Sequence, residues 1–162
     1  MSIIPIERAK EHLRVDGNTE NAIIAVYIEA AESAVSSYVN RKLFATADAL
    51  AAAVALIPAA MVQAYSDYDV ARIAADNIAH PGVRDQARIA AIRQLDATLA
   101  DARQTRNGIV VNETDSHTVL FAAILVTLGV IYNNRDTPNG VGPELPENAR
   151  WLANPHRIFA GA

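Results

Sequence analysis

Histidine and carboxylate side chains are the groups of this chain that could bind a metal or transfer protons. The chain has four histidines, which are His12, His80, His117 and His156. They lie in four separate segments and show none of the close spacings of a metal site. Asp67 and Asp69 lie two positions apart, but alternate residues of a helix point in different directions, so solvent-exposed side chains are the simpler interpretation. We expect no metal, no cofactor and no enzyme activity.

A short acidic turn, Asp16-Gly17-Asn18, is followed by Glu20 and is similar to the start of a calcium-binding loop. Such a loop needs a glycine near its middle and a bidentate glutamate at its last position. Asn21 and Tyr27 occupy those two positions here, so the segment is interpreted as the cap of a helix. The chain also has no cysteine and no P-loop, Gly-x-Ser-x-Gly or Gly-x-Gly-x-x-Gly motif.

The clearest secondary-structure signal of the chain is residues 118–132, an apolar stretch with the sequence TVLFAAILVTLGVIY. A membrane span needs roughly 20 apolar residues, and this stretch is shorter and ends at Asn133-Asn134-Arg135-Asp136. Its apolar residues occupy every face of a helix, as in a helix surrounded by other helices. We therefore predict the central helix of a bundle here, and no membrane segment.

Two helices are predicted before residue 44. The first is an amphipathic helix over residues 5–14, where Pro5 suits the first turn because its φ is fixed. Asn18 or Thr19 is expected to cap the second helix. The apolar stripe of the second helix consists of Ile24, Ile28, Ala31, Val35 and Val39. Asn40 fits the left-handed conformation that ends a helix.

Residues 45–117 are rich in alanine and predict an inserted helical hairpin. Thr46 is expected to cap the first arm, and Pro58 is expected to interrupt or restart it. His80-Pro81-Gly82 is expected to interrupt the helix and form the turn between the two arms. The second arm is predicted over residues 83–106, with one apolar face formed by Ile89, Ile92, Leu95 and Leu99. A short extended connector, Ile109-Val110-Val111, then leads to the central helix.

The last part of the chain, residues 137–162, is expected to form a loop rich in proline and glycine, a short helix from Pro146 to Trp151, and a tail. Aromatic residues and arginine dominate the hot spots of protein interfaces. We therefore predict an assembly interface at Tyr132, Arg135, Asp136, Arg150, Trp151, Arg157, Ile158 and Phe159. The alternatives are a polar helix end at residues 132–136 and docking of the terminus on its own core.

Length, composition and charge indicate the fold class and limit the possible functions. With 162 residues the chain corresponds to one domain, residues 1–162, and its many alanines favour helices over strands. The predicted fold is all-α: a small helical bundle around a central apolar helix, with a core at residues 3–44 and 118–136, an inserted helical hairpin and an extended C-terminal tail. A net charge of −4 argues against a surface that holds nucleic acid. No signal sequence is visible, so we expect the protein to be made in the cytoplasm.

Several segments, in order, resemble the head–tail connector proteins of tailed phages, the adaptors that lie beneath the portal. The first helix resembles their Glu-x-Ala-Lys-x-His-Leu-Arg-x-Asp pattern through Glu7, Ala9, Lys10, His12, Leu13, Arg14 and Asp16. The second helix carries the matching residues Ala30, Ala31, Glu32, Tyr38 and Arg41. The central helix ends in the matching residues Tyr132, Asn134 and Arg135, with Asp136 a conservative change from the family's glutamate. The terminus matches at Leu145-Pro146 and residues 156–159.

This resemblance implies a structural virion protein at the head–tail junction, made in the cytoplasm of a host bacterium. Its copies are expected to form a ring, dodecameric in the virion, under the portal protein. The ring would continue the DNA channel without binding DNA tightly and would meet the next head-completion or tail protein. Asn133 replaces the glutamate usual in the family, and the hairpin at 45–117 is long for it. The alternative is a non-viral helical module for protein–protein interaction or regulation.

Overall fold

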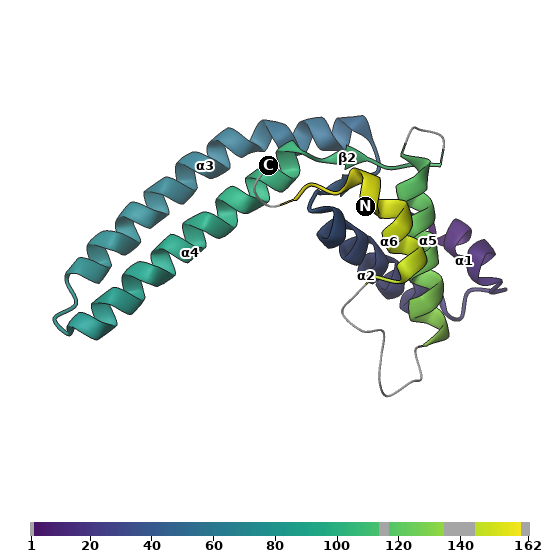
Figure 1. The fold of residues 1–162 in the computed structure, drawn as a ribbon, viewed down its shortest axis with the longest axis horizontal. Coiled ribbons are helices and arrows are strands. Elements are labelled where there is room, and N and C mark those ends of the chain that lie inside the picture. The colour runs from purple at the N-terminus through teal and green to yellow at the C-terminus, as the bar shows by residue number, and fades with distance from the viewer. Residues whose placement is uncertain (1, 114–116, 135–144, 160–162) are drawn as a thin grey trace. The chain divides into compact units, whose positions relative to one another are not determined.

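A computed structural model describes residues 2–113, 117–134 and 145–159. The described residues are mostly helical, and the all-α prediction is confirmed (Figure 1). The α-helices are α1 (Ile6–Leu13), α2 (Asn21–Val39), α3 (Ala47–Asp76), α4 (Pro81–Arg106), α5 (Thr118–Asn133) and α6 (Glu147–Ala153). A 3-10 helix, η1 (Asn154–His156), and two strands, β1 (Leu43–Phe44) and β2 (Ile109–Val110), complete the list.

The chain divides into two compact units, which are described separately. The first unit combines residues Met1–Leu50 and Gly108–Ala162, and the second consists of Ala51–Asn107. The whole main hydrophobic core lies in the first unit. We call the first unit the core unit and the second unit the hairpin.

The central position predicted for the apolar helix is confirmed. In the core unit α5 contacts α1, α2 and α6. Its buried residues are Leu120, Phe121, Ala123, Ile124, Thr127 and Leu128. Thr127 is the one polar residue among them, and its buried hydroxyl donates a hydrogen bond of 2.8 Å to the Ala123 carbonyl one turn earlier. Its polar group is therefore paired within the helix. Partly buried Leu125, Val126 and Ile131 pack around the same core.

The stripe predicted for α2 is also confirmed, since all five of its residues are buried. Asn40 adopts the left-handed conformation with φ 55° and ends the helix, as expected. The predicted cap is wrong: α2 begins at Asn21, after Glu20, and neither Asn18 nor Thr19 caps it. The Asn18 side-chain oxygen instead accepts a hydrogen bond of 3.0 Å from the Lys10 ammonium, so a tertiary contact replaces the local one.

The core unit also contains a parallel pair of short strands, one before and one after the hairpin in the sequence. Leu43 pairs with Ile109 and Phe44 with Val110. The Val111 amide donates to the Phe44 carbonyl over 2.8 Å. The extended connector at 109–111 was predicted correctly, but its pairing with residues 43–44 was not, because a two-residue strand has too short a pattern to recognise.

In the hairpin, α3 and α4 lie side by side as the two arms (Figure 1). Thr46 caps α3 by accepting from the Ala49 amide, as predicted. The prediction for Pro58 is wrong, because α3 continues through it, although proline removes one backbone hydrogen bond. Of the apolar face predicted for α4, Leu95 and Leu99 are half-buried, but Ile89 and Ile92 are 40% and 47% exposed. The residues of α4 that are classed as buried are the smaller Ala91 and Thr105.

Candidate assembly surfaces

The part of the chain that the structure describes contains no group of three or more metal-ligating side chains. It does bring together two histidines that the sequence places in separate segments. The rings of His117, before α5, and His156, in η1, meet edge to face with 5.1 Å between their centroids. Burial lowers the pKa of His156, and the charges of His117 and Arg41 lower it further. This pair ties the tail to the start of the central helix.

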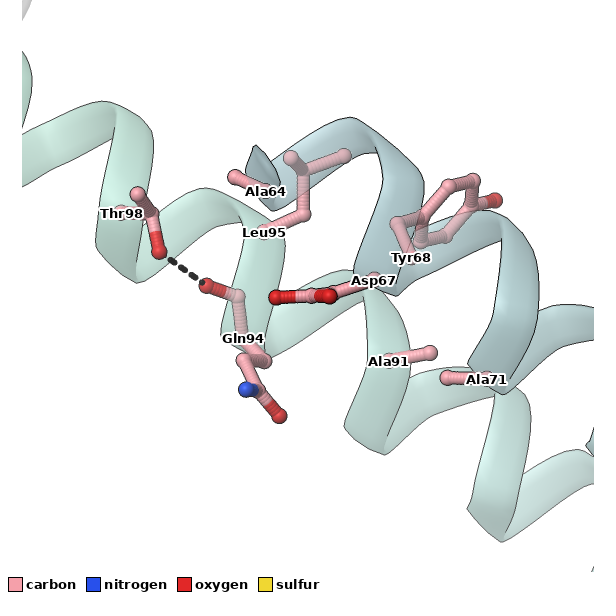
Figure 2. Close-up of a pocket in the computed structure, with 8 residues that line it drawn as sticks. All are labelled: Ala64, Asp67, Tyr68, Ala71, Ala91, Gln94, Leu95 and Thr98. Carbon is pink, nitrogen blue, oxygen red and sulfur yellow. Dashed lines mark hydrogen bonds between the residues drawn. The ribbon is translucent and has the colours of Figure 1, made fainter. Parts of the chain in front are cut away.

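The hairpin has a small hollow between its arms (Figure 2). Its volume is about 60 Å³, and alanines from both arms, among them Ala64 and Ala91, form much of its wall. Asp67 is the one carboxylate that lines it, and the Thr98 hydroxyl donates to the Gln94 carbonyl on α4. The hollow reflects the small side chains where the two helices meet.

The N-terminal residues that resemble the connector pattern hold the start of the chain in place. One carboxylate oxygen of Glu32, on α2, accepts hydrogen bonds from the Ser2 hydroxyl (2.7 Å), the Ile3 amide (2.7 Å) and the Ile4 amide (2.9 Å). Ile3 and Ile4 are thereby buried in the core. Sequence reasoning matched Glu32 to the family but missed this role, because the segment before Pro5 has no pattern of its own.

Two residues of α1, Arg8 and the pattern residue His12, also have defined neighbours. Arg8, inside the same helix, pairs with Glu11 at 2.7 Å and with Glu113, and these carboxylates raise its pKa. His12 lies against α5 at Gly129, where an added Cβ would come within 3.4 Å of the imidazole. Gly129 therefore lets α1 approach the central helix closely.

The end of α5 contains the first of the predicted interface residues. Tyr132 is half-buried, and its hydroxyl donates to a Glu20 carboxylate oxygen at 2.5 Å. Its ring meets that of Tyr27 edge to face, with centroids 6.4 Å apart. Tyr132 thus fastens the end of α5 to the start of α2 within one subunit. Arg135 and Asp136, predicted beside it, lie outside the described residues.

The C-terminal helix packs on the core of its own subunit, beside α5 (Figure 1). It uses small residues: Ala149 and Ala153 are fully buried. The preceding Leu145 is also part of the core, with 6% of its surface exposed. The helix extends two residues beyond the predicted end at Trp151. After it, the Ile158 amide donates to the Val39 carbonyl at 3.0 Å, and Ile158 is partly buried. The sequence left open whether the terminus docks on its own core. It does so through the inward-facing residues of this segment.

The outer face of the same segment carries the other predicted residues. Trp151 is 78% exposed and Phe159 is 63% exposed. The Arg157 guanidinium lies over two aromatic rings, 4.8 Å from the centroid of Tyr38 and 5.0 Å from that of Phe159. Arg150 is half-buried on α6. The structure therefore exposes Trp151, Arg157 and Phe159 on the C-terminal segment, with Arg157 against Phe159, and places Tyr132 on a different element.

The hairpin surface is unusually apolar. The exposed large apolar side chains of α3 are Val54, Leu56, Val62, Tyr65, Val70 and Ile73. By length and composition alone, α2 and α3 are each long and apolar enough to cross a membrane. The core helix of a soluble protein can meet the same two criteria. The sequence prediction considered this only for residues 118–132. In α2 the apolar stripe is buried in the core, whereas only 11% of the tested part of α3 is buried.

Comparisons with known proteins bear on the N-terminal half. Residues 3–76 match the family model described as phage gp6-like head-tail connector protein. The match spans α1, α2 and α3, so the first arm of the hairpin lies inside the matched region. Neither the curated proteins nor the solved structures gave a match to the chain. The family is one of bacteriophage structural proteins, and its members contact portal and tail proteins at the head–tail junction. The resemblance inferred from the sequence is thus confirmed over residues 3–76, which match the phage gp6-like head-tail connector family, whereas the resembling residues 132–136 and 145–159 lie outside the matched region.

Proposed function

We propose that this protein is the adaptor that forms a ring beneath the portal, continues the DNA channel and joins the capsid to the tail. The observation that carries the proposal is the family match over residues 3–76, which includes the motif-bearing helices α1 and α2. The ring is dodecameric in the virion, in register with the portal. The protein acts as a structural part, assembled in the bacterial cytoplasm from copies of one chain.

The surface of the core unit supports this role. A ring of identical subunits needs two different surfaces that meet head to tail and close by rotation. The terminus supplies residues with the features of an interface hot spot, since Trp151 and Phe159 are exposed and Arg157 lies over the Phe159 ring. These side chains stand on a backbone that Ala149, Ala153 and Ile158 fix to the core, so little ordering is needed when a partner binds.

The charge balance suits a channel through which DNA moves. Acidic residues outnumber basic ones by 18 to 14, which gives a net charge of −4. Tight duplex binding depends on the release of many counterions by a basic surface. An acidic subunit therefore leaves the DNA free to pass, and contacts with the portal and the next head-completion or tail protein supply the affinity.

The proposal is tested by deleting the gene from the phage and examining the particles by electron microscopy. We expect capsids that package DNA but carry no tails, and that lose their DNA unless the protein is added back in trans. Mass spectrometry of purified wild-type virions should find the protein in a fixed ratio to the portal protein. Normal tailed particles from the deletion, or absence of the protein from virions, would overturn the proposal.

A further inference from the structure

The core unit contains a groove on the outer side of α2 that no described residue of the terminus fills. It has a volume of about 300 Å³. Six of its lining residues are Glu29, Glu32, Ser33, Lys42, Leu43 and Phe44. The half-buried Leu43 and Phe44 of β1 give it an apolar part, and Glu29 and Glu32 give it two carboxylates against the one ammonium of Lys42. The groove thus combines apolar surface with a net negative charge.

The terminus of the same unit has the complementary composition. Phe159 presents an aromatic ring that is mostly exposed, and the Arg157 guanidinium is stacked between this ring and that of Tyr38. Stacking uses the faces of the guanidinium and leaves its N–H groups, which lie in its plane, free to donate. Among the described contacts, Arg157 forms no ion pair, and neither does Glu29 in the groove.

The groove and this terminus lie on opposite sides of α2. Glu29 and Tyr38 are nine residues apart, and at 3.6 residues per turn nine residues correspond to about two and a half turns. Tyr38 is the residue on which Arg157 stacks, whereas Glu29 lines the groove. The backbone bond from Ile158 to Val39 holds the tail on the Tyr38 side. A subunit in this arrangement does not place its own Phe159 in its own groove.

We propose that the groove binds the Arg157–Phe159 tail of a second copy of this chain, and that this is the head-to-tail contact between neighbours in the ring. The proposal rests on the proposed function and specifies its subunit interface. The Phe159 ring enters the groove against Leu43 and Phe44, and the Arg157 guanidinium donates to the Glu29 carboxylate. Two different surfaces on opposite sides of one helix repeat around a ring, as heterologous contacts require.

The absence of cysteine from the chain allows a direct test by disulfide trapping. Ser33→Cys places a thiol in the groove and Phe159→Cys places one on the tail. The two single variants are mixed, assembled on the purified portal protein and oxidised. We expect a disulfide-linked heterodimer between the two variants, and a ladder of linked oligomers from the chain that carries both substitutions. Ser33→Cys mixed with Asp96→Cys, an exposed residue of α4 outside the proposed contact, serves as the matched control and should give no linked product.

Charge reversal gives an independent readout that does not depend on disulfide geometry. Glu29→Arg and Arg157→Glu should each weaken self-association at least tenfold by sedimentation, and the chain with both reversals should recover most of the loss. Glu147→Arg, an exposed carboxylate on α6, is the control and should change association less than twofold. Circular dichroism checks that every variant folds, and Phe159→Ala provides a second tail variant with no charge change.

The outcomes separate this contact from the proposed function. Rings on the portal without the Ser33–Phe159 cross-link, or with no rescue by the double reversal, would refute the contact and leave the adaptor role standing. Cross-linking of Phe159→Cys to a portal cysteine instead would assign the tail to the portal and also refute the contact. A wild-type chain that forms no oligomer on the portal would overturn both.

Discussion

Removal of the hairpin should leave the core unit folded, because none of the residues of the main hydrophobic core lies between residues 51 and 107. The variant joins Leu50 to Gly108 through a flexible Gly-Ser linker of about eight residues. Residues 45–50 and the linker together have to lead from the end of β1 back to the start of β2, since these strands run parallel in the register Leu43–Ile109. We expect one cooperative unfolding transition for the shortened chain.

The magnitude follows from loop closure. The hairpin is about seven times longer than the linker, just under three doublings, and each doubling of a flexible loop costs about 0.6 kcal/mol. The free energy of unfolding of the core unit should therefore change by less than about 2 kcal/mol. Ile124, fully buried in α5, provides a matched check. Ile124→Ala should lower the free energy of unfolding by about 2–5 kcal/mol. The loss should be the same in the full and the shortened chain, because distant sites contribute additively.

The assay is urea unfolding followed by circular dichroism at 222 nm. In the shortened chain this signal arises from the core unit alone. A broad, non-cooperative transition, a loss well above 2 kcal/mol, or an Ile124→Ala cost that differs between the two chains would refute the reasoning. Such a result would mean that the hairpin contributes to the core, although its buried residues are separate in the structure.

Three further predictions concern single features. Glu32→Ala removes the acceptor of three hydrogen bonds from residues 2–4, so the free energy of unfolding should fall by about 1–3 kcal/mol and amide exchange at Ile3 and Ile4 should be faster by mass spectrometry. The control Ser37→Ala, at an exposed position of the same helix, should change neither quantity. Because the pKa of His156 lies below its unfolded value of about 6.5, the unfolded chain binds more protons, so stability should fall as pH drops below about 6.5. His156→Gln should flatten this dependence in urea titrations at pH 5 to 8, and an unchanged slope would contradict it. Binding to duplex DNA at physiological salt should be weaker than micromolar in fluorescence anisotropy, given the net charge of −4, and nanomolar binding would contradict this.

The sequence was most informative where a periodic pattern continued over several turns. The stripe of α2, the helix end at Asn40 and the central position of α5 could all be predicted, because burial of one apolar face decides them. The cap of α2 was mispredicted because Asn18 is bound by Lys10, and this contact depends on how α1 folds back. Pro58 was overrated as a helix breaker in a segment otherwise made of good helix formers.

The candidate surfaces were predicted in part. The residue types of the terminus indicated an interface, and the structure exposes Trp151 and Phe159 on it. The sequence did not separate these outward residues from Ala149 and Ala153, which dock on the subunit's own core, because a helix of two turns has too few positions to define a face. The contacts of Glu32 with the N-terminus and of His156 with His117 join distant segments, so no local pattern could reveal them.

The central claim is that copies of this chain assemble as a ring on the portal. The most direct measurement is electron microscopy, with mass photometry, of the purified protein mixed with the purified portal protein of the same phage. The account predicts a closed ring stacked on one end of the portal, with a mass increase of about twelve copies of the 17.4 kDa chain and an open central channel. Portal particles of unchanged mass, at protein concentrations well above those of the portal, would contradict it.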